Sequence, residues 1–309
     1  MDQEYDVIGI GVCAFDILIE VDRYPGADEK MEAARIETQG GGVVGTALVA
    51  AARLGGRCAY LGALGDDSFA DFSVAEFEAD GVDTRLIRRV GNASVLVALI
   101  VADRSAGTRM IVWTSDRAPR ISPADVSEEV IRQARVVHVD NYYPAPALEG
   151  ARKARALGVP VTMDLELQDE GAEEFLTLGD YVIVPLEFAQ QRYGADDVEV
   201  GARALYEELA AHGGRAGVVT DGTRGSFAAH GGGSIRQPAY RVEVVDTTGC
   251  GDVYHGAFAL GVARGWELDR TMRVAAATAA LKCRELGGRR GIPDAGEVEE
   301  FLRTAEPIL

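Results

Sequence analysis

The sequence predicts an α/β fold, with a central, mostly parallel sheet covered by helices on both faces and a small separate β-sheet beside it. Over most of the 309 residues, short β-branched runs alternate with helical segments, as in parallel sheets with helical connections. Two ribbon-like stretches, 12–40 and 94–118, interrupt this alternation because they contain no crossover helix. We expect them to form a small lid, and 1–11, 41–93 and 119–309 to form the core.

The first third of the chain opens with two different strand patterns. Residues 5–11 are mostly apolar, as in a buried strand, whereas 15–21 alternate between apolar and polar residues, as in a more exposed one. A glycine pair at 55–56 predicts the end of a small-residue helix at Leu54. The other elements expected here are strands over 31–38 and 58–61, a helix over 68–80, and a hairpin formed by 94–101 and 108–113.

The remainder of the chain continues the alternation. The glycine run 231–233 predicts a hairpin turn. We expect strands over 136–139, 159–163, 181–184 and 217–220, and helices over 145–157, 198–211, 252–264, 267–285 and 295–303.

Composition excludes some classes of function. Against 49 acidic residues there are 31 Lys and Arg, a formal charge of −18, so nucleic acid is not an expected partner. No apolar run reaches the roughly 18 residues that a membrane span needs. The acidic stretch 1–6 lacks the basic region of a secretory signal. The four cysteines form no CxxC pair, so we expect reduced thiols in a cytoplasmic protein; they are Cys13, Cys58, Cys250 and Cys283.

The segment Asp246-Thr247-Thr248-Gly249-Cys250-Gly251-Asp252 carries the clearest chemistry. Its two glycines allow a tight turn, and a helix starts directly after them. The free N–H groups and the dipole of that helix favour an anion, such as a phosphoryl group in transfer. Asp252, in the first turn, either stabilises the helix or accepts a proton from an attacking hydroxyl.

This segment resembles the second signature of the ribokinase-like (PfkB) sugar kinases, Asp-Thr-x-Gly-Ala-Gly-Asp, with cysteine in place of alanine. The resemblance implies an ATP-dependent kinase in which Asp252 is the general base. It also implies that the amides of Gly249, Cys250 and Gly251 form the anion hole, with Thr248 beside the nucleotide.

Further stretches extend the resemblance along nearly the whole chain. Taken singly, each has a simpler interpretation as a turn or a solvated strand residue, but their order and spacing favour the family. The resemblance implies sugar contacts at Asp16, Gly41, Gly42 and Thr46, to which we add Asn141 at the end of a strand. It implies ATP contacts at Thr220, Gly222 and Gly225, and at Gly288 within the stretch 276–293 beside the adenine.

The chain departs from the family pattern at two places. Thr46 stands where the first signature has asparagine, which alters one sugar contact. The stretch Pro185-Leu186-Glu187-Phe188 replaces the family's Asn-x-x-Glu, which is tied to magnesium. Mg²⁺ is still expected because triphosphate transfer needs charge neutralisation; Glu187 is its candidate ligand, alongside phosphates and water. Several family members bind a monovalent cation, and here Asp246 and Thr248 would hold K⁺.

Within the family, the motifs resemble those of sulfofructose kinases most closely. The shared stretches are the triple glycine 40–42, 245–257, 280–283 and 287–294. A sulfonate requires Arg or Lys at the sugar end. Candidates are Arg109, Arg117 and Arg120, but the stretch 139–143 at the same end suits neutral hydroxyls better, so the acceptor stays open between a ketose and a sulfofructose-like sugar.

Other classes of function are weaker matches. A dinucleotide-binding enzyme would need a third glycine after Gly9 and Gly11, and there is no P-loop motif. A nucleoside kinase of the same fold and a non-catalytic sugar-binding protein remain as alternatives. We expect a homodimer through the lid, because a small exposed sheet leaves open edges and an apolar face. We also expect His255, Lys282 and Cys283 to be packing residues, and Arg289 and Arg290 to be solvated or to contact phosphates.

Overall fold

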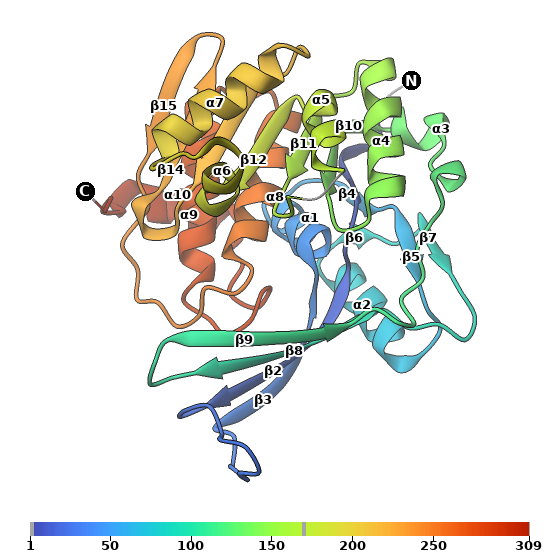
Figure 1. Cartoon of the computed structure of the whole chain (residues 1–309). Coiled ribbons are helices and arrows are strands. Elements are labelled where there is room, and N and C mark those ends of the chain that lie inside the picture. Colours follow the sequence, from blue (N-terminus) through green and yellow to red (C-terminus); the bar gives the residue numbers. More distant parts are fainter. Residues whose placement is uncertain (1–2, 169–170, 309) are drawn as a thin grey trace.

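The computed structural model describes residues 3–168 and 171–308 and contains one large sheet and one small sheet. Figure 1 shows the small sheet standing below the helix-covered core. Strands of the large sheet are, in spatial order, β15 (Gly233–Gln237), β14 (Ser226–His230), β13 (Ala216–Thr220), β12 (Tyr181–Pro185), β11 (Val161–Asp164), β10 (Ala134–Asp140), β1 (Tyr5–Ile10), β4 (Cys58–Tyr60) and β6 (Val82–Asp83).

The strands from β13 through β6 in this order are parallel, and β14 and β15 add an antiparallel edge. β1 lies between β10 and β4, and all six of its residues are buried. Its mostly apolar sequence is typical of a strand covered on both faces. The hairpin of β14 and β15 turns at 231–232, which confirms the hairpin predicted at the glycine run.

Helices cover the two faces of the large sheet and enclose two hydrophobic clusters. One cluster contains residues of α4, α5, α6 and α7, and the other contains residues of α1, α2, α8, α9 and α10. The helices are α1 (Val43–Arg53), α2 (Ser68–Ala79), α3 (Glu128–Ile131), α4 (Pro144–Leu157), α5 (Ala172–Leu178), α6 (Leu186–Tyr193), α7 (Val198–Ala210), α8 (Cys250–Ala263), α9 (Leu268–Lys282) and α10 (Ala295–Thr304), with 3₁₀ turns η1 (Pro123–Asp125) and η2 (Gly222–Arg224). This arrangement confirms the predicted α/β class.

The small sheet has the order β3 (Arg35–Gly41), β2 (Ala14–Val21), β8 (Leu96–Asp103) and β9 (Thr108–Thr114). β8 and β9 pair antiparallel, which confirms the predicted hairpin, while β2 and β8 pair in parallel. The prediction of a more exposed strand over 15–21 was wrong, because none of these residues is exposed and Asp16 and Leu18 are buried on one face. Their face of the strand is turned toward the core, and the sequence alternation could not indicate this tertiary contact.

Several elements differ from the predictions. β3 starts at Arg35 rather than at residue 31 and continues through Gly40 and Gly41, so these glycines form the end of a strand. The short helices α3, α5 and α6 and the short strands β5 (Gly62–Leu64), β6 and β7 (Ile87–Arg89) were not predicted, because elements of two to eight residues carry little periodicity. Among the described residues, no helix combines the length and apolar character needed to cross a membrane.

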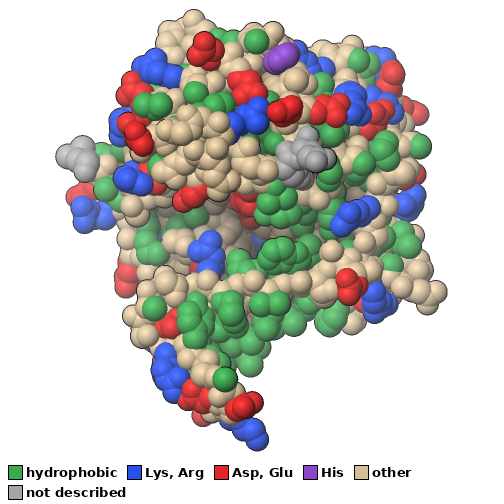
Figure 2. All heavy atoms as spheres, in the orientation of Figure 1, with side chains coloured by type: hydrophobic (Ala, Val, Ile, Leu, Met, Phe, Trp, Pro, Cys, Tyr) green, Lys and Arg blue, Asp and Glu red, His purple; other side chains and the backbone are tan. Residues whose placement is uncertain are grey.

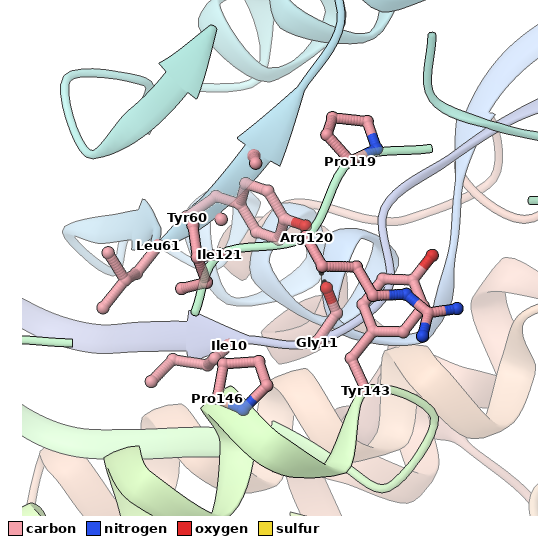
Figure 3. A pocket seen from close by; sticks show the side chains of 11 residues that line it. Ile10, Gly11, Tyr60, Leu61, Pro119, Arg120, Ile121, Tyr143 and Pro146 are labelled. Carbon is pink, nitrogen blue, oxygen red and sulfur yellow. Dashed lines mark hydrogen bonds between the residues drawn. The ribbon is translucent and has the colours of Figure 1, made fainter. Parts of the chain in front are cut away.

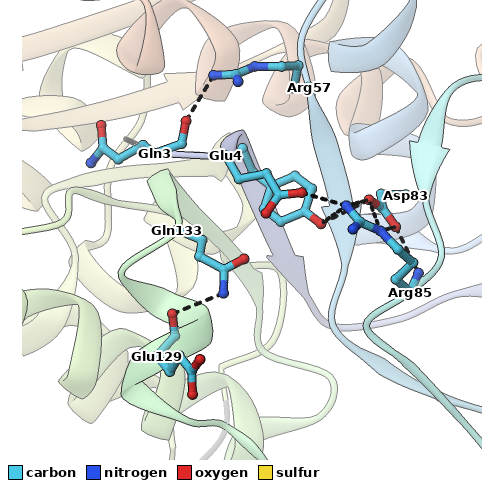
Figure 4. Close-up of polar contacts among 8 residues, drawn as sticks. Gln3, Glu4, Arg57, Asp83, Arg85, Glu129 and Gln133 are labelled. Carbon is cyan, nitrogen blue, oxygen red and sulfur yellow. Dashed lines mark hydrogen bonds and ion pairs between the residues drawn. The ribbon is translucent and has the colours of Figure 1, made fainter. Parts of the chain in front are cut away.

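A polar cluster fastens the amino end of β1 to its neighbours, as Figure 4 shows. The Arg85 guanidinium contacts the carboxylates of Glu4, at 2.6 Å, and of Asp83. The Tyr5 hydroxyl donates to Asp83 Oδ2 at 2.9 Å. These contacts join the amino end of β1 to the end of β6.

Candidate functional site

The candidate site lies where the carboxyl ends of β10 and β11 meet the start of α8. Asp140 and Asp164 end these two strands and are paired in register. Open parallel sheets bind their ligands at this edge. Figure 2 shows the surface hollowed between the core and the small sheet.

In the predicted anion loop, the chain turns at Gly249, the residue directly before α8. Gly249 has a φ of +71°, and a Cβ atom there would come within 2.8 Å of Gly288 Cα. The close approach of these two glycines brings together two predicted site residues that are far apart in sequence. The Cys250 N–H donates to the Thr247 carbonyl at 3.2 Å, whereas the N–H groups of Gly249 and Gly251 donate to no backbone carbonyl of the described residues, and that of Gly251 faces the Cys250 thiol. Two of the three predicted amides are therefore available to an anion.

Asp246 holds this loop in place through its carboxylate. Its Oδ1 accepts from the Thr248 N–H at 2.9 Å and hydroxyl at 2.8 Å, and its Oδ2 accepts from the Gly287 N–H at 2.7 Å. Burial alone would raise the pKa of Asp246, but the Lys282 charge and these hydrogen bonds outweigh burial and lower it. From the small sheet, Arg109 Nη1 donates to Thr247 Oγ1 at 3.0 Å.

An acidic cluster lies beside the loop. Carboxylate oxygens of Asp164, Glu166 and Asp252 all lie within 4.8 Å of one another. Asp164 is 2% exposed and neither of its oxygens has a hydrogen-bond partner. His255 Nε2 lies 3.4 Å from Asp164 Oδ2, but burial lowers the pKa of His255 well below its ordinary value, which disfavours a cationic ring. Burial, followed by the charge of Glu166, raises the pKa of both Asp164 and Asp252 well above the ordinary value.

The oxygens of this cluster fit a divalent cation, since hard cations prefer carboxylate ligands and Asp164 is buried without a partner. Glu187, the candidate magnesium ligand from the sequence, is not part of the cluster and lies exposed in the first turn of α6. Sequence reasoning missed Asp164 and Glu166. The signal that could have found them is the acidic pair that directly follows a predicted buried strand.

The predicted sugar residues Asp16, Gly41 and Gly42 lie together where the small sheet joins α1. A Cβ atom on Gly41 would lie 2.0 Å from Asp16 Oδ2, and Gly42 has a φ of +84°. Asp16 is 6% exposed, and its carboxylate has no hydrogen-bond partner among the residues described. Burial raises its pKa to about 6, and the Arg289 charge opposes this rise. The carboxylate is thus available to a ligand.

Thr46 and Asn141, the other two predicted sugar residues, are both almost fully buried. Thr46 lies in α1, and its Oγ1 would be 3.7 Å from a Cβ atom on Gly288. Thr46 is therefore next to the place where Gly288 approaches Gly249. Asn141 donates from Nδ2 to the Leu167 carbonyl at 2.8 Å and accepts from the Glu166 N–H at 3.3 Å. Its amide thus holds the 166–167 backbone, and its contact with a sugar stays a prediction.

Arg289 is buried, whereas the sequence predicted a solvated residue or a contact with phosphates. It is 1% exposed, and its guanidinium carbon lies 4.9 Å from the centre of the Phe77 ring. Its Nη2 donates to the Gly41 carbonyl at 2.8 Å. A Cβ atom on Gly40 would lie 2.1 Å from Nη1, which explains the first of the three glycines. Arg290, in contrast, is exposed and pairs with Glu37 at 2.8 Å.

Three of the predicted nucleotide residues lie at or just after the carboxyl end of β13. Thr220 ends this strand, and Gly222 and Gly225 begin and follow η2. A Cβ atom on Gly225 would come within 2.3 Å of the Gln237 carbonyl, so a larger residue cannot replace it without moving the backbone. The predicted packing role of His255 agrees with its burial.

Comparison with known proteins decides the family. The model of the pfkB family of carbohydrate kinases matches residues 7–295. The chain belongs to this family. It is therefore a phosphotransferase with an alcohol group as acceptor, and more specifically a sugar or nucleoside kinase.

Individual relatives cover nearly the whole of this pfkB kinase. Ribokinase of Bacillus subtilis is 27% identical and covers 95% of this chain and 98% of its own. The ATP-dependent ribose-1-phosphate kinase of Halopiger xanaduensis is 29% identical, with 96% and 97% covered. The crystal structure of a ribokinase candidate from Agrobacterium tumefaciens superimposes with a TM-score of 0.87 at 28% identity, covering 97% of both chains. Arabidopsis thaliana ribokinase complexed with ribose and ATP gives 0.82 at 25%, covering 98% and 99%.

Proposed function

We propose that this pfkB kinase transfers the γ-phosphoryl group of ATP to a primary hydroxyl of a small sugar, with Asp252 as general base. The observation that carries the proposal is the position of Asp252. It lies in the first turn of α8, beside the free N–H groups of Gly249 and Gly251 and within the acidic cluster. A non-catalytic sugar-binding protein would have no need for a half-buried carboxylate with a raised pKa next to an anion loop.

In the proposed mechanism, Asp16, Gly41, Gly42 and Thr46 bind the sugar and orient its hydroxyl toward Asp252. Asp252 accepts the hydroxyl proton as the oxygen attacks phosphorus. The free amides of Gly249 and Gly251 stabilise the charge on the transferred group. Thr220, Gly222, Gly225, Thr248 and Gly288 line the nucleotide site.

Mg²⁺ would be held by Asp164 and Glu166 together with the phosphates of ATP, where it neutralises charge on the triphosphate. We propose further that 12–40 and 94–118 act as a lid on the remaining core. The hydrogen bond from Arg109 to Thr247 supports this role, since it joins β9 to the anion loop. A closed lid excludes water and so limits ATP hydrolysis.

A substrate screen tests the proposal. Thermal shifts of the protein with a nonhydrolysable ATP analogue, Mg²⁺ and a panel of ketoses, sulfosugars, inositols and nucleosides should reveal the acceptor, because ligands stabilise in proportion to their occupancy. Hits are then assayed for ADP release. Phosphorylation of nucleosides but no sugar would overturn the sugar assignment, and binding of a sugar without turnover would overturn the enzymatic one.

Arg120 is the residue we propose to bind an anionic substituent, if the acceptor is sulfofructose-like. Its guanidinium carbon lies 4.4 Å from the centre of the Tyr143 ring. Figure 3 shows both residues lining a pocket with Gly11, directly after the carboxyl end of β1. The other two candidates are engaged elsewhere: Arg109 with Thr247, and Arg117 with Asp67 at 3.8 Å. The relative named for ribose-1-phosphate, a sugar that already bears an anion, supports such a substituent.

We therefore expect Arg120→Gln to weaken sulfofructose binding about 10-fold to 100-fold, the usual value of a charge-assisted hydrogen bond, and to leave fructose binding unchanged. Isothermal titration with each sugar measures both effects. Arg117→Gln serves as the control and should alter neither. An equal loss of affinity for sulfofructose and fructose in Arg120→Gln would show that Arg120 does not bind the anionic substituent.

The small sheet also supports a homodimer. In its register, Ile36, Leu99, Met110 and Val112 fall on one face, opposite the face of Asp16. All four are exposed, and Figure 2 shows hydrophobic side chains gathered over this sheet. We expect Val112→Glu to convert a dimer into a monomer in light scattering, and Trp113→Glu, on the opposite face of β9, to leave the dimer intact. A monomeric wild-type protein at micromolar concentration would refute the proposal.

A further inference from the structure

Lys282 is the last residue of α9, and its side chain is 0% exposed. A buried ammonium is costly unless charges and hydrogen bonds compensate for it. Its Nζ donates to the Asp246 carbonyl at 3.0 Å. The packing role predicted from the sequence is therefore incomplete, because the end of this side chain contacts the first residue of the anion-loop segment.

The surroundings of the ammonium are those of a cation site. The Asp246 carbonyl and carboxylate supply negative charge, and the end of α9 adds the negative end of the helix dipole. The N–H groups of Val245 and Asp246 both donate to the Cys283 carbonyl, at 2.8 and 3.1 Å, so the segment is fastened to this helix end. Burial lowers the pKa of Lys282, and the charge of Asp246 opposes this change.

The same contacts leave little for a cation from solution to bind. The three hydrogen bonds to the Asp246 carboxylate come from the chain itself, two from Thr248 in the loop and one from Gly287 after α9. Asp246 and Thr248 were the residues expected to hold K⁺. The positive charge at this place is instead supplied by the chain.

We propose that the Lys282 ammonium is a built-in cation that positions the anion loop, so that the loop requires no monovalent cation from solution. This inference rests on the proposed function only in assigning the loop to phosphate binding. In the proposed mechanism, Lys282 contacts neither the substrate nor the reacting atoms. It is a positioning residue that acts through Asp246 and the turn that ends at Gly249.

The test uses chemical rescue in the full-length protein. The probe is the nonhydrolysable ATP analogue AMP-PNP with Mg²⁺, and the supporting salt is tetramethylammonium, potassium, ammonium or methylammonium chloride. For the wild type, the thermal midpoint and the AMP-PNP affinity should be the same in all four salts. Lys282→Ala in tetramethylammonium should lose about 5–10 °C in thermal midpoint, as expected when one partner of a buried ionic contact is removed.

In Lys282→Ala, AMP-PNP affinity should fall about 10-fold or more in tetramethylammonium, the loss expected when a charge-assisted contact is removed. Ammonium or methylammonium should restore most of it by entering the vacated space. Lys282→Met, which fills that space without a charge, should show the loss but no rescue. Lys153→Ala is the matched control, since its Nζ also donates to a backbone carbonyl, that of Val126, and it should show no salt dependence.

A wild type that needs K⁺ for AMP-PNP affinity would overturn the proposal, and so would a Lys282→Ala protein with full affinity in tetramethylammonium. Should Lys282→Ala fail to fold, the wild-type salt series and Lys282→Met still decide the question. These measurements need no acceptor sugar. A failure of the sugar-kinase proposal, seen in the substrate screen, is therefore separate from a failure here.

Discussion

Asp252→Asn should reduce turnover of the true acceptor by about 10²-fold to 10⁴-fold, the usual contribution of general base catalysis. Asparagine keeps the shape of the side chain in the first turn of α8 but cannot accept the hydroxyl proton. AMP-PNP binding should be preserved, because the free amides of Gly249 and Gly251 do not depend on this side chain. Steady-state kinetics together with AMP-PNP titration separate the two effects.

Asp269→Asn is the matched control, because Asp269 is an exposed aspartate in the first turn of α9. There a carboxylate favours the helix dipole, a contribution of about 0.3–1 kcal/mol to stability. Turnover should be unaffected by this change. Undiminished turnover in Asp252→Asn would reduce Asp252 to the same helix-stabilising role and remove the base from the mechanism.

The pH profile gives a second readout of the same residue. Because burial and Glu166 raise the pKa of Asp252, its protonated form persists to higher pH than that of an ordinary carboxyl group. A base acts only when it is ionised, so kcat/KM should rise with pH on an acidic limb that lies above the ordinary carboxyl range. This limb should be absent from the residual activity of Asp252→Asn.

Gly256→Ala should lower the free energy of unfolding by about 3 kcal/mol, at the upper end of the usual cost of overpacking. A Cβ atom on Gly256 would lie 1.9 Å from the Ala47 carbonyl oxygen. The obstacle is the backbone of α1, which cannot move aside as a flexible side chain would. Since α1 carries Thr46 and α8 carries Asp252, the substitution should also separate the sugar and phosphate sides of the site.

Urea unfolding measures this loss, with Gly251→Ala as the control for stability. Both glycines lie in α8, but a Cβ atom on Gly251 would have no neighbour within 4 Å, and alanine favours a helix over glycine by about 1 kcal/mol. Gly251→Ala should therefore be as stable as the wild type or slightly more so. Equal stability of the Gly256→Ala protein would mean that α1 and α8 can separate at no cost.

The sequence by itself determined the fold class and the reaction class. The alternation of apolar runs and helical segments predicts the large sheet, because the hydrophobic period of each strand or helix can be recognised within its own stretch of sequence. The anion-binding loop and its candidate base could also be predicted from the segment 246–252, because two glycines, a helix start and Asp252 are neighbours in the chain.

Only the tertiary structure decided how distant residues combine. Asp164 and Glu166 join Asp252 in one cluster because β11 ends at the edge of the sheet where α8 begins. From the sequence alone, Arg289 was expected to be solvated or to contact phosphates, and Lys282 was expected to be a packing residue. The fold buries both charges, one against the Gly40–Gly41 backbone and the other against Asp246. Burial of a charge depends on what surrounds it in space, and a single sequence contains no direct record of those surroundings.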